Sequence, residues 1–298
     1  MPKRCVIVNP KAGSIKGVES ELFAQIDRLD PAEIKKTHGN GEAESLARAG
    51  VANGCDEIIC AGGDGTLNEI INGVAENFGR VQIGIVPLGT GNDFVRSLGT
   101  PTTIPEAVDV LLAGETDTVD VIRAKSDQMR YFVNVSAGGF SGLVDEKLTP
   151  EMKKTWGPLA YLRSAAAAWP ELRGYETFVD IDDERVDETL YNVVIANARY
   201  VAGGLPIAPE ADMRDGEMDV VLVKARPVTE MMVVGAQMLA GKHLDSSAVI
   251  FERAKRVRVE STPGMWFNAD GELIGNEPVT FEVMPRALKF VVKRDESK

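Results

Sequence analysis

Short apolar runs alternate with helical patterns over the first third of the chain. Runs that predict buried strands occur at 4–10, 33–37, 56–61 and 81–87. The stretches between and after them have the spacing of amphipathic helices, at 17–29, 42–52 and 66–77. Strands that alternate with helices over short connections are typical of βαβ units. This part of the chain therefore predicts a parallel sheet that is covered by helices on both faces.

The pattern changes after about residue 123. Short segments of alternating apolar and polar residues, separated by turn signals, occur at 131–139, 176–183, 188–198, 217–223, 256–260, 265–272 and 278–283. They predict antiparallel strands in a sandwich, interrupted by helices near 151–169 and 227–240. The acidic run at 180–188 is typical of a solvated hairpin. A last strand at 287–293 could return to either domain.

We therefore expect an α/β protein of two domains with a cleft between them. The first, residues 1–123, is a doubly wound, mostly parallel sheet, and residues 286–298 could return to it. The second, residues 124–285, is a mainly antiparallel β-sandwich. A length of 298 residues is comfortable for two domains.

Composition narrows the chemistry that this chain can perform. The formal net charge of −12 disfavours a nucleic-acid partner. Only two histidines are present, His38 and His243, so acid–base chemistry falls to carboxylates. The three cysteines lie within the first 60 residues without metal spacing and predict reduced thiols in a cytoplasmic protein. No stretch reaches the ~18 apolar residues of a membrane span, and the first apolar run is too short for a signal peptide.

Three polar loops that contain glycine follow predicted strands directly, at 9–13 (NPKAG), 62–66 (GGDGT) and 88–92 (LGTGN). Ligands of open α/β sheets gather at the carboxyl ends of the strands, so we expect the three loops to meet at one edge. Glycines there let the backbone approach phosphate groups closely. Neither GxxxxGK[ST] nor GxGxxG occurs, so neither a P-loop nor a standard dinucleotide fold is indicated.

The loop at 62–66 places an acid where a phosphate would bind. Asp64 would repel phosphate oxygens unless a cation lay between them, so it predicts a Mg²⁺ site. Thr66 and Glu69 have the spacing of a capping box, which predicts a helix that begins at Thr66. Asn92 is placed to cap another helix. The plainer alternative is a strand–turn–helix junction that binds no ligand.

The motifs NPKAG, GGDGTLNEIINGV and PLGTGNDFVRSLG, with Thr37 after the first, resemble the catalytic domain of diacylglycerol kinases in order and spacing. Bacterial soluble lipid kinases have this domain, and sphingosine and ceramide kinases share it. The resemblance continues at DMRDGEMDVVLV and FNADGELI and covers nearly the whole chain. It implies transfer of the γ-phosphoryl group of ATP, with Mg²⁺, to the hydroxyl of diacylglycerol. A long-chain base, a ceramide-like lipid or a polyprenol remains as an alternative acceptor.

The resemblance also implies which residues bind ATP. The contacts would come from Asn9, Pro10, Lys11, Ala12, Gly13, Thr37, Gly62, Gly63, Asp64, Gly65, Thr66, Leu67, Asn68 and Thr90. Asp64 would join a Mg²⁺–water network, and Asp93 would lie beside the acceptor hydroxyl.

In the second domain the resemblance implies a metal site and a general base. A structural Mg²⁺ would be bound by Asp215, flanked by Asp212 and Glu217, although an Asp-Gly pair by itself predicts a hairpin turn. The base would be Asp270 or Glu272, which share one side of an extended segment.

A lipid kinase acts at a membrane surface, so we expect ATP and a lipid as partners and peripheral contact with the membrane. The methionine-rich stretch 228–241 and the stretch 156–170, with Trp156, Tyr161 and Trp169, suit a bilayer interface. An ordinary core helix is the simpler interpretation of each. A homodimer is compatible with the sequence. The competing functions are an NAD kinase, which shares GGDG, and a non-catalytic nucleotide-binding module.

Overall fold

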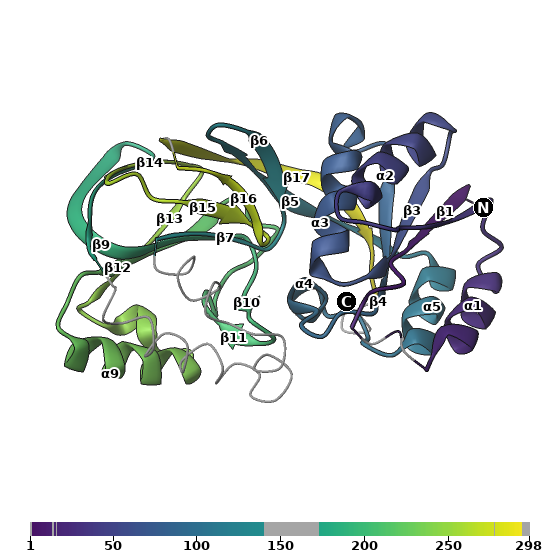
Figure 1. The fold of residues 1–298 in the computed structure, drawn as a ribbon, viewed down its shortest axis with the longest axis horizontal. Coiled ribbons are helices and arrows are strands. Elements are labelled where there is room, and N and C mark those ends of the chain that lie inside the picture. Colours follow the sequence, from purple (N-terminus) through teal and green to yellow (C-terminus); the bar gives the residue numbers. More distant parts are fainter. Residues whose placement is uncertain (1, 14, 16, 140–172, 277, 294–298) are drawn as a thin grey trace. The chain divides into compact units, whose positions relative to one another are not determined.

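The computed structural model of the chain (Figure 1) describes residues 2–13, 15, 17–139, 173–276 and 278–293. The chain divides into two compact units, one of Met1–Asp120 with Arg286–Lys298 and one of Val121–Pro285. The helix expected near 151–169 and its aromatic residues lie outside the described residues. No helix in the described ranges is long and apolar enough to cross a membrane.

The first unit is built on a parallel sheet with the strand order β2–β1–β3–β4–β17. Its first four strands are β1 (Arg4–Val8), β2 (Glu33–Lys36), β3 (Glu57–Gly62) and β4 (Gln82–Pro87). Its helices are α1 (Glu19–Asp27), α2 (Glu42–Ala52), α3 (Asp64–Gly73), α4 (Asp93–Leu98) and α5 (Ile104–Ala113), with a 3₁₀ turn, η1, at Ala75–Asn77. Figure 1 shows α1 beside α5 and α2 beside α3.

Helices cover both faces of this sheet. Successive residues of a strand point to opposite faces, and the residues on each face are apolar, so each face is buried against helices. On one face, Val6 and Ile59 pack in a cluster with Leu22 of α1 and Leu111 of α5. On the other face, Gly50 of α2 lies so close to the sheet that a Cβ there would be 3.1 Å from Ile58 and 3.2 Å from Cys5. The predicted doubly wound sheet is confirmed.

The second unit is antiparallel. Its strands are β5 (Thr116–Lys125, which begins in the first unit), β6 (Met129–Phe132), β7 (Val135–Gly139), β8 (Tyr175–Ile181), β9 (Glu184–Ala196), β10 (Tyr200–Val201), β11 (Leu205–Pro206), β12 (Met218–Lys224), β13 (Val249–Ala254), β14 (Arg256–Thr262), β15 (Phe267–Ala269) and β16 (Glu272–Gly275). The described residues of this unit also form the helices α9 (Val228–Leu239) and η3 (His243–Asp245). The predicted β-sandwich is confirmed, and the acidic run at 180–188 forms the β8–β9 hairpin.

Strand β9 is buried on both faces where it passes through the middle of this unit. Val193 and Ile195 join the sandwich core with Phe281. Val194 faces the other way and packs in a cluster with Val234 of α9, and Figure 1 shows α9 on that side of β9 and β12. Val234 is the one fully buried residue of α9. The interpretation of 228–241 as an ordinary core helix therefore holds for the face that contains Val234, whereas Met232 and Val233 are exposed.

One long strand replaces two predicted ones at the end of the chain. The segments 278–283 and 287–293 form a single strand, β17 (Val279–Val291). Its first part pairs with β14 in the second unit, and Lys289 and Phe290 pair with β4 in the first. Pro285 and Arg286, whose φ is 47°, interrupt the alternating pattern without ending the strand. Conversely, the predicted strand at 131–139 is two strands, β6 and β7.

Candidate functional site

The three polar loops of the first unit meet, as their positions after β1, β3 and β4 predict. Nδ2 of Asn9 donates a hydrogen bond of 2.9 Å to Oγ1 of Thr66, which joins the first loop to the second. A Cβ on Gly13 would lie only 2.6 Å from Cγ2 of Thr90, so the first loop also lies against the third. A side chain on Gly13 would therefore require the exposed side chain of Thr90 to turn aside.

The second and third loops are in backbone contact. A Cβ on Gly63 would lie 2.9 Å from Cα of Gly89. Asn92, with a φ of 50°, closes the third loop on itself: its Oδ1 accepts the N–H of Gly89 at 3.1 Å and its Nδ2 donates to the Gly89 carbonyl at 2.9 Å. Its side chain makes no capping bond to α4, so the predicted cap by Asn92 is wrong.

Asp64 performs that capping from the neighbouring loop. Its Oδ2 accepts the N–H of Asp93 and its Oδ1 accepts the N–H of Phe94, each at 3.3 Å. The first N–H groups of a helix have no partner inside it, and the helix dipole favours a negative charge there. The side chain of Asp93 is buried. Asp64 therefore joins the second loop to the start of α4, where Asp93 lies.

The capping box predicted at Thr66 and Glu69 is wrong. Helix α3 begins at Asp64, two residues earlier than expected. Oε2 of Glu69 accepts the N–H of Ala43 at 2.9 Å, in the first turn of α2. The glutamate thus caps a neighbouring helix because α2 and α3 pack side by side.

The predicted ATP contacts fall into three groups by exposure. The exposed residues are Pro10, Lys11, Gly13, Gly65 and Thr90, and the buried ones are Thr37, Gly62, Thr66, Leu67 and Asn68. Asn9, Ala12, Gly63 and Asp64 are intermediate. Nζ of Lys11 donates to the carbonyl of His38 at 2.9 Å, which holds a cation beside the loops.

These residues fit a polyphosphate with its Mg²⁺. The start of α3 presents N–H groups that no helix can satisfy internally. Gly65 has no atom within 4 Å of the position that a Cβ would occupy, so the space beside this turn is open. Mg²⁺ prefers oxygen ligands, and Asp64 and Asp93 are the carboxylates that this part of the unit offers.

In the second unit, Asp270 opens the two-residue turn between β15 and β16 with a φ of 47°. Its Oδ1 accepts the N–H groups of Asn134 at 3.2 Å and Val135 at 2.9 Å, and its Oδ2 accepts that of Val133 at 3.2 Å. These bonds fix the hairpin to the segment before β7. Glu272, the first residue of β16, is exposed.

Two asparagines that the sequence analysis missed support the segment that binds Asp270. Nδ2 of Asn197 donates to the carbonyl of Val133 at 2.8 Å, and Nδ2 of Asn134 donates to that of Tyr200 at 3.1 Å. Both asparagines are buried. The signal that could have identified them is a polar residue within an apolar run, in FVNVS and VIANA.

Asp212 and Asp215 each close a tight turn before β12. Oδ1 of Asp212 accepts the N–H of Arg214 at 3.1 Å, and Oδ1 of Asp215 accepts that of Glu217 at 2.9 Å. Because β12 pairs with β9 and β13, this turn does not connect adjacent strands, and the hairpin alternative is wrong. In the described part of the chain no three His, Cys, Asp or Glu side chains are grouped to hold a metal ion. The metal site expected at Asp215, with Asp212 and Glu217 beside it, stays a prediction.

The cysteines take no part in either group. Cys5, Cys55 and Cys60 are free and buried, as predicted. Burial raises the pKa of Cys5 to about 12 and also raises the pKa of Cys60, so both remain protonated thiols at neutral pH.

Known proteins share both units of this chain. Residues 3–124 match the diacylglycerol kinase catalytic domain, and residues 134–292 match the YegS C-terminal NAD kinase beta sandwich-like domain. A diacylglycerol kinase of Staphylococcus saprophyticus is 31% identical over 299 residues, which cover 99% of this chain and 97% of that protein. A diacylglycerol kinase of Bacillus subtilis is 29% identical over 303 residues, covering 100% and 98%.

The catalytic domain and the relatives define a class of enzyme, the ATP-dependent lipid kinases. Within that class, the chain belongs to the diacylglycerol kinase family.

Solved structures show the same fold. A diacylglycerol kinase from Bacillus anthracis superposes with a TM-score of 0.74 at 23% identity, covering 98% of this chain and 97% of that one. An NAD kinase from Archaeoglobus fulgidus, solved in complex with ATP, superposes with a TM-score of 0.55 at 15% identity, covering 99% and 94%. NAD kinases thus share the fold of this chain.

Proposed function

We propose that this chain transfers the γ-phosphoryl group of ATP to the hydroxyl of diacylglycerol, with Mg²⁺, and forms phosphatidic acid. The observation that carries the proposal is the contact of the three loops after β1, β3 and β4, joined by Asn9–Thr66 and by Asp64 at the start of α4. The names of the relatives that cover both units support the acceptor. Phosphoryl transfer needs mainly positioning and stabilisation of charge, which such loops provide.

The start of α3 would bind the phosphates of ATP. Its N–H groups point out of the helix, at the positive end of the helix dipole. Lys11 is exposed beside the same loops and its ammonium group donates to a backbone carbonyl, so it can turn to a phosphate oxygen at little cost. The buried residues Leu67 and Asn68 would act through their backbone.

Asp64 and Asp93 would hold the Mg²⁺ that accompanies ATP, and this ion would supply neutralisation of the phosphate charge. A carboxylate has about four lone-pair positions. The two N–H groups that Asp64 accepts therefore leave room for a cation on the same side chain. The capping bonds would also fix the direction in which Asp64 offers its oxygens.

Glu272 would accept the proton of the lipid hydroxyl, and Asp270 would act as a positioning residue. The oxygens of Asp270 already accept three N–H groups, which compete for the lone pairs that a base must use. The side chain of Glu272 is exposed on the strand that the Asp270 turn holds in place. In the transfer, the hydroxyl oxygen bonds to the γ-phosphorus, the bond from that phosphorus to the β–γ bridging oxygen breaks, and ADP leaves.

A structural Mg²⁺ would bind at the turn of Asp215, with backbone carbonyls completing the ligands. If it does, 5 mM Mg²⁺ without ATP should raise the melting temperature of the wild type and not that of Asp215→Ala. A metal at about 100 times its dissociation constant stabilises by ~2.7 kcal/mol. If Mg²⁺ does not change the melting temperature of the wild type, the turn of Asp215 does not bind a structural metal.

The function is tested by incubating the purified chain with γ-³²P-ATP, Mg²⁺ and one acceptor at a time. The acceptors are diacylglycerol, a long-chain base, NAD and none. We expect label in phosphatidic acid, lost when EDTA removes the metal. Label in NAD would identify an NAD kinase, which the shared fold makes the main competitor. ATP binding by calorimetry without any labelled acceptor would support a non-catalytic module.

A further inference from the structure

Helix α9 presents a second apolar face that nothing in the described part of its unit covers. The exposed fraction is 71% for Met232, 55% for Val233, 44% for Val228 and 42% for Leu239. Residues 228, 232, 236 and 240 follow each other at the i, i+4 spacing, so they form one stripe along the helix. Val234, Met231 and Met238 pack into the unit on a different side of the helix. A helix that is apolar on opposite faces is typical of burial on both.

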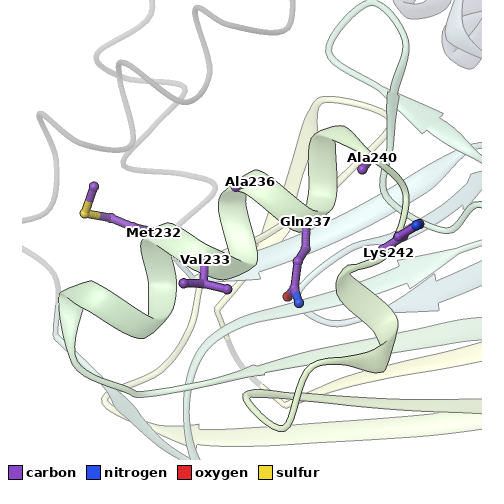
Figure 2. Close-up of a pocket in the computed structure, with 6 residues that line it drawn as sticks. All are labelled: Met232, Val233, Ala236, Gln237, Ala240 and Lys242. Atoms are coloured by element: carbon purple, nitrogen blue, oxygen red, sulfur yellow. The ribbon is translucent and has the colours of Figure 1, made fainter.

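The stripe borders a shallow hollow of about 430 Å³, lined by Met232, Val233, Ala236, Gln237, Ala240 and Lys242. Figure 2 shows these residues spread along α9 and onto the segment after it, with Met232 extending away from the strands. An exposed apolar surface of this extent on a water-soluble unit marks a place of contact with a partner. The flexible side chain of methionine suits a partner without a fixed shape.

The charges around the hollow favour an anionic partner. Lys242 is the only charged residue that lines it, in a chain whose formal net charge is −12. The single acidic residue within α9, Glu230, lies in the first turn and not among the lining residues. An apolar stripe that ends at a lysine matches a surface with an apolar interior and anionic head groups.

We propose that the stripe of α9 together with Val233 and Lys242, here named the α9 face, inserts into the head-group region of an anionic lipid bilayer. The proposal rests on the proposed function, because a kinase whose acceptor has two acyl chains must reach it in a membrane. The α9 face holds the chain on the surface that contains its substrate, and contact between two copies of the chain is the competing use of this face.

The test compares the wild type with the double variant M232E/V233E and with the control M129E, which alters a methionine of the same unit that is 55% exposed. Flotation uses vesicles of phosphatidylcholine alone and of 70% phosphatidylcholine with 30% phosphatidylglycerol. We expect the wild type and M129E to float with the anionic vesicles and M232E/V233E to bind at least tenfold more weakly. Circular dichroism melts of the three proteins should coincide, because the altered side chains are exposed.

Kinase assays separate this proposal from the proposed function. A short-chain diacylglycerol dissolved below its micellar concentration should be phosphorylated equally by all three proteins, whereas diacylglycerol in vesicles should be phosphorylated at least tenfold more slowly by M232E/V233E. If none of the three proteins phosphorylates either form of diacylglycerol, but the wild type still floats more strongly than M232E/V233E, the proposed function is wrong and the proposal for the α9 face is supported. Equal flotation of wild type and M232E/V233E overturns the α9 face. The α9 face is also overturned if light scattering shows that the wild type is a dimer and M232E/V233E a monomer, while M232E/V233E still floats with the anionic vesicles.

Discussion

At the scale of single residues, Asp64 accepts two N–H groups at the start of α4 and, in the proposed function, also offers carboxylate oxygens to Mg²⁺. Asp64→Asn keeps the size of the side chain and one acceptor oxygen but removes the charge. We expect kcat to fall about 10²–10³-fold, because charge stabilisation at a phosphoryl-transfer site is lost. The loss of stability should be only ~1 kcal/mol, the usual value for a helix cap. Steady-state kinetics and thermal denaturation measure the two effects.

The matched control for Asp64 is Glu76→Gln, which removes an exposed carboxylate from η1. It should change neither turnover nor stability. Wild-type turnover in Asp64→Asn at saturating Mg²⁺ would leave Asp64 with only its capping role.

Asp270 and Glu272 should respond to substitution in opposite ways. Asp270→Asn weakens three hydrogen bonds to backbone N–H groups, so it should lower the free energy of unfolding by ~1–3 kcal/mol. Glu272→Gln alters an exposed side chain and should leave stability within ~0.5 kcal/mol. It should lower kcat about 10²–10⁴-fold without changing ATP affinity, because a general base is lost. Denaturant titration, calorimetry and turnover give the three readouts.

The reverse pattern would exchange the roles of these two residues. Full activity in Glu272→Gln, together with a large loss of kcat and unchanged stability in Asp270→Asn, would make Asp270 the base. If neither loses more than about tenfold in kcat, Asp93 becomes the next candidate.

His243 should make stability depend on pH. Its side chain is fully buried in η3 and its Nε2 lies 2.9 Å from the carbonyl of Ile207. Burial lowers its pKa from 6.5, so the folded state favours the neutral ring. The stability it contributes is present above pH 6.5 and is lost as the pH falls, by at most ~1.4 kcal/mol per unit. Melting curves from pH 8 to 5 should therefore fall more steeply for the wild type than for His243→Gln; parallel curves would contradict this.

At the scale of elements, the contact between α2 and α3 depends on the absence of a side chain. A Cβ on Gly73 would lie 2.3 Å from the carbonyl oxygen of Glu44 and 2.9 Å from Cβ of Ala47. Gly73→Ala should therefore lower the free energy of unfolding by ~1–3 kcal/mol through overpacking, although alanine favours helices. Gly39→Ala is the control, since Gly39 has no atom within 4 Å of its Cβ position. If Gly73→Ala and Gly39→Ala unfold at the same urea concentration, α2 and α3 can move apart to accommodate the added methyl group without loss of stability.

The elements themselves were largely predictable, whereas their contacts were not. Helix α2 occupies the predicted residues, because its apolar period is a local property of the chain. The cap of α4 and the partner of Glu69 were predicted wrongly, because both lie on other elements. The outward apolar face of α9 has the same period as a buried face, so periodicity could not tell exposure from burial.

At the scale of the whole molecule, the end of the chain completes the first unit. Phe290 of β17 is fully buried, and its ring centroid lies 5.0 Å from that of Phe94, whose N–H bonds to Asp64. Phe290→Ala should cost ~3–5 kcal/mol of stability and weaken ATP binding, because the packing beneath the third loop is lost. Phe178→Ala, on a side chain that is 37% exposed, should cost much less. If Phe290→Ala is destabilised but binds ATP as tightly as the wild type, the nucleotide-binding loops do not depend on this packing.

The sequence by itself determined most of the strands and helices, although not α5, β5 or β13, together with the three loops after three strands and the family. These features depend on the local spacing of apolar residues and on motifs that are continuous in the sequence. Only the tertiary structure decided which N–H groups Asp64 and Asp270 bind, that β17 serves both units, and that α9 exposes an apolar stripe. The bonded partners lie between 29 and 137 residues away in the chain, so no local pattern records them. Burial is likewise decided by what packs against a face, and neighbours distant in sequence provide that packing.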